Sequence, residues 1–222
     1  MRYARLVGFI LVFAAVGGLA TPAQAQDTRP PELAPLASVR DTAILLFNDR
    51  PLQVCERAWQ SWNRVYGVCR DLATATVYDQ RLIAGTTVEF VLFDGTRYER
   101  VNEATTWTAS PDPEFRPDLP LGEALFQIDE QARVTRVGPA DVAGTPTVQY
   151  QYWVLDEERT TQAGGQVVYD QFISSAQYVV KAHLSVRGSV AGLGDGTLME
   201  IRTFRDFNAP VTIAPPAAAT AT

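Results

Sequence analysis

Nucleophilic catalysis is the first chemistry for which the side chains of this sequence can be tested. A serine or cysteine nucleophile needs a base beside it, most often histidine. The only histidine is His183, which lies in a run of alternating apolar and polar residues and is typical of a solvated strand position. The segment Gly188–Gly192 carries its serine one position too early for the nucleophile elbow of hydrolases. We therefore expect no catalytic residues and a protein that is not an enzyme.

Three other motifs could bind phosphate, transfer protons or hold a metal. The glycine-rich segment Gly192–Gly196 lacks the Lys-Ser/Thr of a P-loop and the spacing of a dinucleotide fingerprint, so a tight turn is the better interpretation. Asp129-Glu130 and Glu157-Glu158 are adjacent pairs, and neighbouring strand residues point to opposite faces, which disfavours an acid/base dyad. Two cysteines and one distant histidine do not supply the four ligands of a structural zinc site. We expect neither a metal nor a cofactor.

The N-terminal residues have the pattern of a cleavable signal peptide. Arg2 and Arg5 are positively charged, Leu6–Val16 is apolar, and the small residues Ala23 and Ala25 form a cleavage site, so we expect cleavage after the second alanine. The apolar run is shorter than the roughly 20 residues that a permanent membrane span needs. An uncleaved anchor is the alternative. No cysteine lies near the cleavage site, so we expect a protein without a lipid anchor that works outside the cytoplasm, secreted or periplasmic.

The two cysteines, Cys55 and Cys69, are expected to form a disulfide because an exported chain matures in an oxidising compartment. On one straight helix their Cα atoms would lie about 21 Å apart, whereas a disulfide needs them within about 7 Å. A bond therefore requires the chain to reverse between them, and Asn63 or Gly67 could provide the break. Two free buried thiols are the alternative.

Composition and charge narrow the classes of partner. The chain is 46% hydrophobic, which excludes wholesale disorder. Its net charge is -6, and nothing clusters its arginines into a patch, whereas binding to a phosphate backbone requires clustered positive charge. We therefore expect no nucleic-acid partner.

Two helices are expected near the N-terminus. Apolar residues at three- and four-residue spacing predict one helix over residues 33–47 and a second over residues 54–65. The residues that carry the two patterns are Leu36, Val39, Ala43, Leu45 and Leu46 in the first, and Val54, Ala58, Trp62 and Val65 in the second.

From residue 86 onward the pattern is typical of β-strands. Thr87–Phe93 and Thr96–Val101 flank Asp94-Gly95, a strong two-residue hairpin signal. Tyr178–Arg187 alternates with a period of two, which places Val180, Ala182, Leu184 and Val186 on one face of a strand. Further strands are expected over residues 105–108, 133–137, 147–155, 167–173, 198–207 and 210–213, with a turn at 138–139 and a short helix over 121–128. Helices followed by sequential antiparallel strands predict an α+β domain.

The chain divides into four parts. We expect a signal peptide over residues 1–25, a flexible proline-rich leader over 26–35, a single domain over 36–213 and a disordered tail over 214–222. The tail contains only proline, alanine and threonine, so it lacks side chains to bury.

With its strands assigned, the sequence resembles the LolA-like superfamily, especially LppX/LprG-type lipid or lipoprotein carriers. The resemblance rests on the turn Asp94–Tyr98, the segment Gly144–Tyr152, the strand Tyr178–Lys181 and the closing run Phe204–Pro216. It implies a strongly curved antiparallel half-barrel with N-terminal helices packed on the concave side and an apolar cavity between them. The sequence departs from the lipoprotein branch because it lacks a lipidated cysteine and has the Cys55/Cys69 pair.

The resemblance also implies a function, that of an exported non-enzymatic protein holding an acyl chain or a lipidated partner in an apolar groove. The expected partners are a hydrophobic small molecule or lipid and a lipoprotein or envelope protein, with transient membrane contact. The alternative is a structural or regulatory interaction domain of the cell envelope whose aromatic residues fill a closed core. Strand side chains expected to face inward and line the groove are Phe90, Leu92, Tyr98, Trp107, Tyr152, Val180, Leu184 and Ile201.

Overall fold

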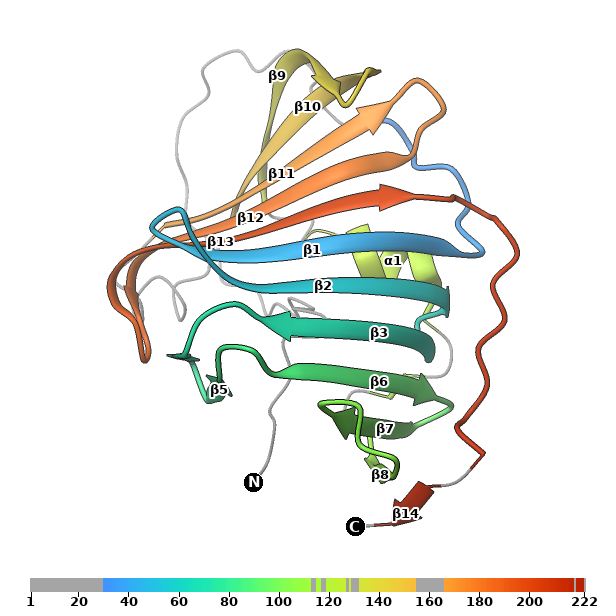
Figure 1. The fold of residues 1–222 in the computed structure, drawn as a ribbon. Helices are drawn as coiled ribbons and strands as arrows, with labels where there is room; N and C mark the ends of the chain where they lie inside the picture. Colours follow the sequence, from blue (N-terminus) through green and yellow to red (C-terminus); the bar gives the residue numbers. More distant parts are fainter. Residues whose placement is uncertain are drawn as a thin grey trace.

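The main feature of the computed structural model is one open, strongly curved sheet of twelve strands (Figure 1). The structure describes residues 30–112, 115–116, 119–126, 128, 132–154, 166–217 and 219–221. The sheet contains β1 (Val39–Phe47), β2 (Arg50–Ser61), β3 (Arg64–Asp71), β6 (Thr87–Phe93), β7 (Thr96–Val101), β8 (Trp107–Pro111), β9 (Arg133–Val142), β10 (Thr145–Val154), β11 (Gln166–Ser174), β12 (Val179–Val190), β13 (Gly194–Arg205) and β14 (Ala219–Ala221). A separate hairpin consists of β4 (Ala75–Val77) and β5 (Gln80–Leu82), and the described helix is α1 (Leu121–Phe126).

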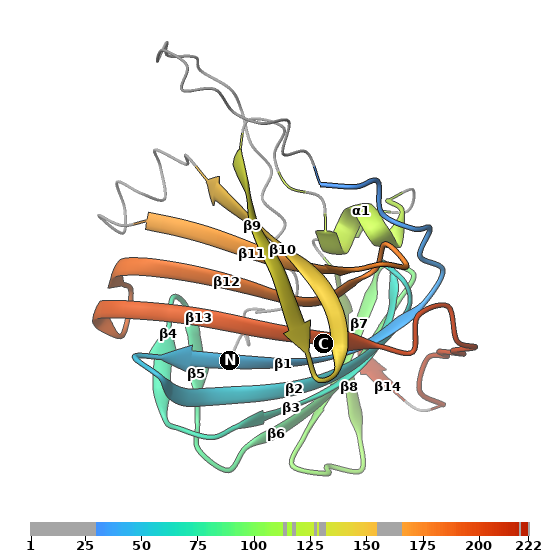
Figure 2. The same ribbon diagram turned by 90° about the horizontal axis from the view of Figure 1, so that it is seen from above.

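Two antiparallel meanders build the sheet. Strands β1, β2, β3, β6, β7 and β8 form one meander, and β9 to β13 form the other. Strand β13 returns to pair with β1, so the order across the sheet is β14-β8-β7-β6-β3-β2-β1-β13-β12-β11-β10-β9. All of these pairs are antiparallel except β14 with β8. The sheet curves around α1, which lies on its concave side (Figure 2). The curved antiparallel sheet expected from the sequence is therefore confirmed.

The N-terminal helices expected from the sequence are wrong, because residues 39–47 form β1. The buried side chains of β1 alternate along the strand and belong to Val39, Asp41, Ala43 and Leu45. A charged residue at the second of these positions hides the period of two, and the remaining apolar residues then fall at helical spacing. After β1, Asn48 and Asp49 form a two-residue turn. Both have positive φ, as a type I′ hairpin turn requires.

The second expected helix is replaced by β2, a turn and β3. Val54 and Ala58 lie on the convex face of β2, Trp62 lies in the turn, and Val65 lies on the concave face of β3. The spacing of these four residues therefore imitates one helical face although they lie on two faces of a hairpin.

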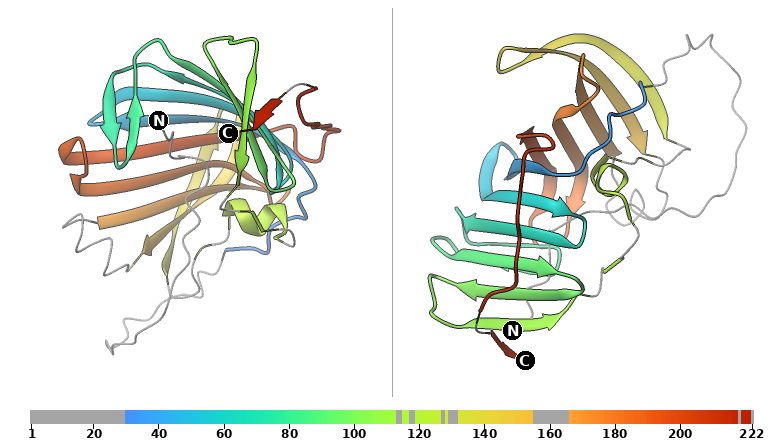
Figure 3. Two further views of the ribbon diagram at one scale, coloured as in Figure 1. Left: turned by 90° about the horizontal axis from the view of Figure 1, so that it is seen from below. Right: turned by 90° about the vertical axis from the view of Figure 1, so that its right-hand side faces the viewer.

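Buried apolar side chains on the concave side form two clusters at opposite ends of the strands. The helix cluster contains Trp59 and Phe204 and is covered by α1, whose Phe126 ring packs edge-on against Phe204 with centroids 4.9 Å apart. The hairpin cluster contains Val77 and Leu82 of the β4–β5 hairpin and Leu198 of β13. Figure 3 shows α1 and the β4–β5 hairpin near opposite ends of the strands of the curved sheet.

Some of the other observed elements match those expected from the sequence, and some do not. Strands β6 and β7 have the predicted bounds, and Asp94 and Gly95 between them have φ values of 44° and 90°. The turn expected at residues 138–139 lies instead at 143–144, because β9 continues through the glycine with a bulge in its pairing to β10. Residues 210–213 are not a strand, although Ile213 is buried and its amide donates to the side chain of Gln60.

The two ends of the described chain are held against the sheet. Leu33, which falls in the leader expected to be flexible, packs on the helix cluster, and the Ala34 amide donates to the Gln177 carbonyl. In the tail for which the sequence predicts disorder, β14 adds to the edge of β8, a contact that needs backbone groups and no buried side chain.

The expected signal peptide and its cleavage site lie outside the described residues. Within the described part, no helix has the length and apolar character to cross a membrane.

Candidate functional site

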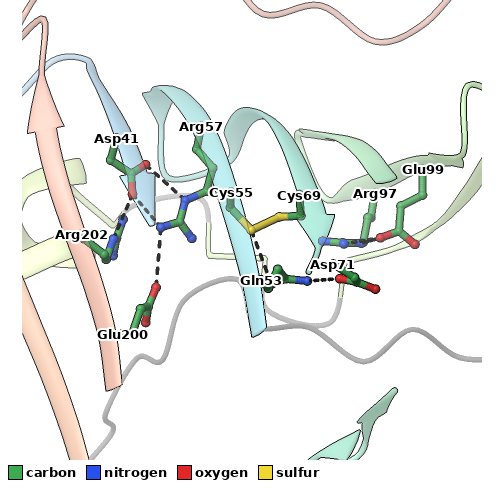
Figure 4. Close-up of a disulfide and its surroundings, with 10 residues drawn as sticks. All are labelled: Asp41, Gln53, Cys55, Arg57, Cys69, Asp71, Arg97, Glu99, Glu200 and Arg202. Atoms are coloured by element: carbon green, nitrogen blue, oxygen red, sulfur yellow. Dashed lines mark hydrogen bonds and ion pairs between the residues drawn. A yellow bond between two sulfur atoms is a disulfide. The ribbon is translucent and has the colours of Figure 1, made fainter. Parts of the chain in front are cut away.

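A row of charged and amide side chains crosses the middle of the concave face (Figure 4). Strand register places its members side by side, because residues paired across antiparallel strands point to the same face. Asp41 on β1 pairs with Arg57 on β2, and Arg202 on β13 lies beside Ala43, two residues further along β1. The members of this polar row are Asp41, Gln53, Arg57, Asp71, Arg97, Glu99, Glu200 and Arg202.

Asp41 is the centre of the row and is fully buried. Its carboxylate accepts hydrogen bonds from Arg57 Nη2 at 2.6 Å and Nε at 3.2 Å, from Trp59 Nε1 at 2.7 Å and from Arg202 Nε at 3.0 Å. Burial alone would raise the pKa of this carboxyl group, but the charges of Arg57 and Arg202 and the hydrogen bonds outweigh burial and lower the pKa to about 2. Asp41 is therefore ionised and its acceptor capacity is filled.

Two charged groups near Asp41 are less completely paired. Glu200 Oε1 lies 3.7 Å from Arg57 Nη2, which is longer than a direct hydrogen bond, and its side chain is 15% exposed. The Nη2 atom of Arg202 is buried without a hydrogen-bond partner. The same strand, β13, places Glu200 and Arg202 two residues apart and therefore on one face. An acceptor with unused capacity and a buried donor without a partner thus lie on the same face of β13.

A small hollow, with room for about one water-sized group, lies beside these charges. It is lined by Ala43, Leu45, Gln53, Cys55, Arg57 and Glu200. Short side chains at Ala43 and Cys55 leave the space, and the longer Arg57 and Glu200 border it. The hollow is therefore lined by apolar side chains together with Gln53 and the charged Arg57 and Glu200.

The disulfide expected from the sequence is present at this hollow. Cys55 and Cys69 are directly opposite each other in the β2–β3 pair, with their Cα atoms 4.0 Å apart. The chain reverses between them at residues 62–63, so Asn63 supplies the break and Gly67 does not. Gly67 has a different role, because a Cβ atom there would lie 2.4 Å from the Phe90 ring.

A strip of half-buried apolar side chains continues from the hollow across β12 and β11. Leu184 is paired with Glu200 on one side and with Tyr169 on the other, and Val186 is paired with Leu198. Leu184, Val186 and Tyr169 are half-buried, and Tyr169 packs against the helix cluster while Val186 packs against the hairpin cluster. Burial raises the pKa of the Tyr169 hydroxyl, and the charges of both Arg202 and Glu200 act on it, so this side chain lies near the polar row. We name these three residues the apolar strip.

The structure divides the eight predicted groove residues between the two faces. Phe90, Leu92, Tyr152 and Leu184 are on the concave face, and the first three are buried in the helix cluster. Val180 is skipped by the pairing of β12 with β11, where a bulge gives the inward position to Val179. The three that lie on the convex face are Tyr98, Trp107 and Ile201.

Sequence reasoning missed the polar row. One signal for it was available, because Asp41 is flanked at two-residue spacing by the apolar Val39 and Ala43, which predicts a buried acid if the segment is read as a strand. The groups that neutralise it come from β2 and β13, and their register with β1 cannot be read from local pattern.

Two other chemistries tested in the sequence, histidine-based catalysis and metal binding, can be compared with the structure, whereas the pairs Asp129-Glu130 and Glu157-Glu158 lie outside the described residues. His183 is on the convex face, with its ring 5.2 Å from that of Phe172. Within the described ranges, no group of three His, Cys, Asp or Glu side chains is placed to hold a metal ion.

Comparison with known proteins gives a fold and no sequence relative. No protein-family model matches the chain, and no curated protein matches it by sequence. Among solved structures it is similar to LprF from Mycobacterium bovis, with 18% identity, a TM-score of 0.53, and coverage of 82% of this chain and 90% of that chain. A weaker likeness is to the Mycobacterium tuberculosis lipoprotein LppX, with 13% identity, a TM-score of 0.48, and coverage of 81% of this chain and 90% of that chain. Another is to LolA superfamily protein NE2245 from Nitrosomonas europaea, with 8% identity, a TM-score of 0.28, and coverage of 78% of this chain and 86% of that chain. The likeness to LprF supports the LolA-like fold that the sequence resemblance implies.

Proposed function

We propose that this chain, whose fold is LolA-like, is an exported, non-enzymatic binding protein that holds an apolar ligand against the concave face of its sheet. The observation that carries the proposal is the apolar strip of Tyr169, Leu184 and Val186. These side chains are inward-facing and only half-buried, and they continue directly into the hollow between Arg57 and Glu200. A strip of this kind at a concavity is typical of a ligand site.

The energetics favour a ligand with a long apolar chain. Each CH₂ group that is removed from water contributes about 0.8 kcal/mol. A chain of about a dozen carbons could therefore bind with useful affinity even if only part of its surface is covered, after the cost of immobilising the ligand is subtracted. The ligand needs no reaction at the site, and His183, the only histidine, lies on the opposite face.

Two features support export. The disulfide is the kind of cross-link that persists in an oxidising compartment. The N-terminal sequence has the charged, apolar and small-residue regions of a signal peptide. We propose that the mature protein works outside the cytoplasm, where it exchanges its ligand with a membrane or a lipidated partner.

The direct test is a thermal unfolding series on delipidated protein with single-chain lipids of increasing length. We expect the unfolding temperature to rise with chain length, because a ligand that binds only the native state stabilises it. An unfolding temperature unchanged by fatty acids, monoglycerides and phospholipids alike would contradict the proposal.

A second candidate is an interaction domain of the cell envelope with a filled core. It is favoured by the burial of Phe90, Leu92 and Tyr152, three of the residues expected to line a groove. In that case the protein would show no response to lipids, and size-exclusion chromatography with other envelope proteins would reveal a complex.

A further inference from the structure

We propose that the polar end of the ligand binds at the hollow between Arg57 and Glu200, and that this end is uncharged and carries a hydroxyl group. This inference rests on the proposed function and names the class of ligand for the same concave face. The ligand is then a single-chain amphiphile of the monoglyceride type, with its head at the polar row and its chain along the apolar strip.

Charge balance is the first argument for a neutral head. Asp41 and Glu200 carry two negative charges, and Arg57 and Arg202 carry two positive charges, so the four-residue cluster is neutral. The side chains of Asp41 and Arg57 are 0% and 2% exposed, and those of Glu200 and Arg202 are 15% and 14% exposed. A carboxylate or an ammonium group brought into this site would be a desolvated charge without a counterion, which is costly.

Hydrogen-bonding capacity is the second argument. Glu200 lies 3.7 Å from Arg57 Nη2, so its carboxylate has room to accept a hydrogen bond from a ligand. Arg202 does not line the hollow and its Nη2 is buried, so we expect the hydrogen bond to the ligand at Glu200. A hydroxyl group is about the size of a water molecule and can donate, so one hydroxyl of a glycerol head can enter the hollow and donate to Glu200. An ester oxygen or an alkane cannot donate to Glu200.

The path of the apolar chain is the third argument. Glu200 is paired across the sheet with Leu184, and Leu184 with Tyr169. A head bound at Glu200 therefore starts its chain directly on the apolar strip. The opposite direction along the row leads to Gln53 and Asp71, which hydrogen-bond each other at 2.8 Å and offer no apolar surface.

The test compares three ligands with the same twelve-carbon chain, namely glycerol monolaurate, laurate and methyl laurate, at pH 7.5. Delipidated protein is titrated with each below its aggregation concentration, and displacement of a bound fluorescent acyl probe gives the affinity. We expect glycerol monolaurate to bind about tenfold more tightly than either laurate, which brings an uncompensated charge, or methyl laurate, which cannot donate. Laurate binding as tightly as the monoglyceride would overturn the inference.

A single substitution should remove the preference for an uncharged head. Glu200→Gln leaves the cluster with one net positive charge, so laurate should bind about tenfold more tightly to this variant than to the native protein. Glu56→Gln is the matched control, because it makes the same change of charge at an exposed position on the convex face of β2. We expect Glu56→Gln to bind all three ligands as the native protein does. Equal behaviour of the two variants would contradict a head-group site at Glu200.

The outcomes separate this inference from the proposed function. If the acyl probe does not bind and none of the three ligands raises the unfolding temperature, the binding function itself is wrong. If all three bind with equal affinity, the apolar ligand stands and the hydroxyl-bearing head is wrong.

Discussion

Arg57 Nη2 lies 2.6 Å from Asp41 Oδ2, and both side chains are buried on the concave face of the sheet. The pair joins the first two strands of the domain, and Arg202 ties the same carboxylate to β13. These three strands connect the two meanders. A buried ion pair of this kind contributes less to stability than its Coulomb energy suggests, but removing one partner leaves the other charge unpaired.

Asp41→Asn should therefore destabilise the protein strongly. The substitution leaves Arg57 and Arg202 without the carboxylate that binds both, and we expect a loss of about 3 kcal/mol in the free energy of unfolding. Urea denaturation should show a lower midpoint with an unchanged slope. Asp206→Asn is the control, because that side chain is 50% exposed in its pair with Arg40, and it should change stability by less than about 0.5 kcal/mol. Equal stability of the two variants would refute the role of Asp41.

The same carboxyl group predicts the acid sensitivity of the fold. The pKa of Asp41 is about 2, below its ordinary value of 3.8, so between these two pH values the unfolded state binds more protons than the native state. Its contribution of about 2 kcal/mol is complete above pH 3.8 and is lost as the pH falls toward 2. Unfolding free energies measured from pH 5 to pH 2 should fall more steeply for the native protein than for Asp41→Asn. Parallel curves would contradict the lowered pKa.

The disulfide should stabilise the domain by restricting the unfolded chain. Cys55 and Cys69 are separated by 14 residues, and a loop of this size gives about 3 kcal/mol in the chain-entropy model. The double variant Cys55→Ala/Cys69→Ala should therefore unfold at lower urea concentration, with its fold retained. Intact-mass measurement of the native protein should show a deficit of two hydrogens. A full complement of thiol hydrogens, or a double variant as stable as the native protein, would contradict the bond.

His183 offers a spectroscopic test of the convex face. Burial lowers the pKa of its imidazole, and the nearby Lys181 lowers it further. As the only histidine, it gives an unambiguous NMR titration, whose midpoint should lie below the ordinary value of 6.5 and rise in Lys181→Gln. The native state then binds fewer protons than the unfolded state just below pH 6.5, so this residue's contribution to stability falls as the pH drops through 6.5. A midpoint at or above 6.5 would be evidence against this packing.

The parts of the fold that local sequence predicts are those with a clear local cause. Strands β6 and β7 alternate or contain β-branched and aromatic residues, and Asp94-Gly95 between them adopts the positive φ values of a tight turn. The region of β1 could not be assigned in the same way, because Asp41 is polar in sequence and buried in the structure. Its burial depends on Arg57 and Arg202, which only the folded sheet brings together.

The candidate site shows the same division. Leu184 lies on the concave face, where the clear period of two in its strand predicts an inward position. Tyr98 and Ile201 were assigned to the wrong face, since a shift of one residue in an alternating segment exchanges the two faces. Glu200, which borders the hollow, is the immediate neighbour of Ile201 and illustrates that exchange.

The central claim is that an apolar ligand binds the concave face, and it is tested most directly by comparing Leu184→Gln with Ile201→Gln. Both residues are half-buried aliphatics on neighbouring strands, and they lie on opposite faces of the sheet. Affinity for a twelve-carbon monoglyceride is measured for both variants and for the native protein. We expect Leu184→Gln to lose about tenfold in affinity, because it places an amide in the path of the chain, while Ile201→Gln binds as the native protein does. Equal affinities for the two variants, or a loss confined to Ile201→Gln, would contradict a concave-face site.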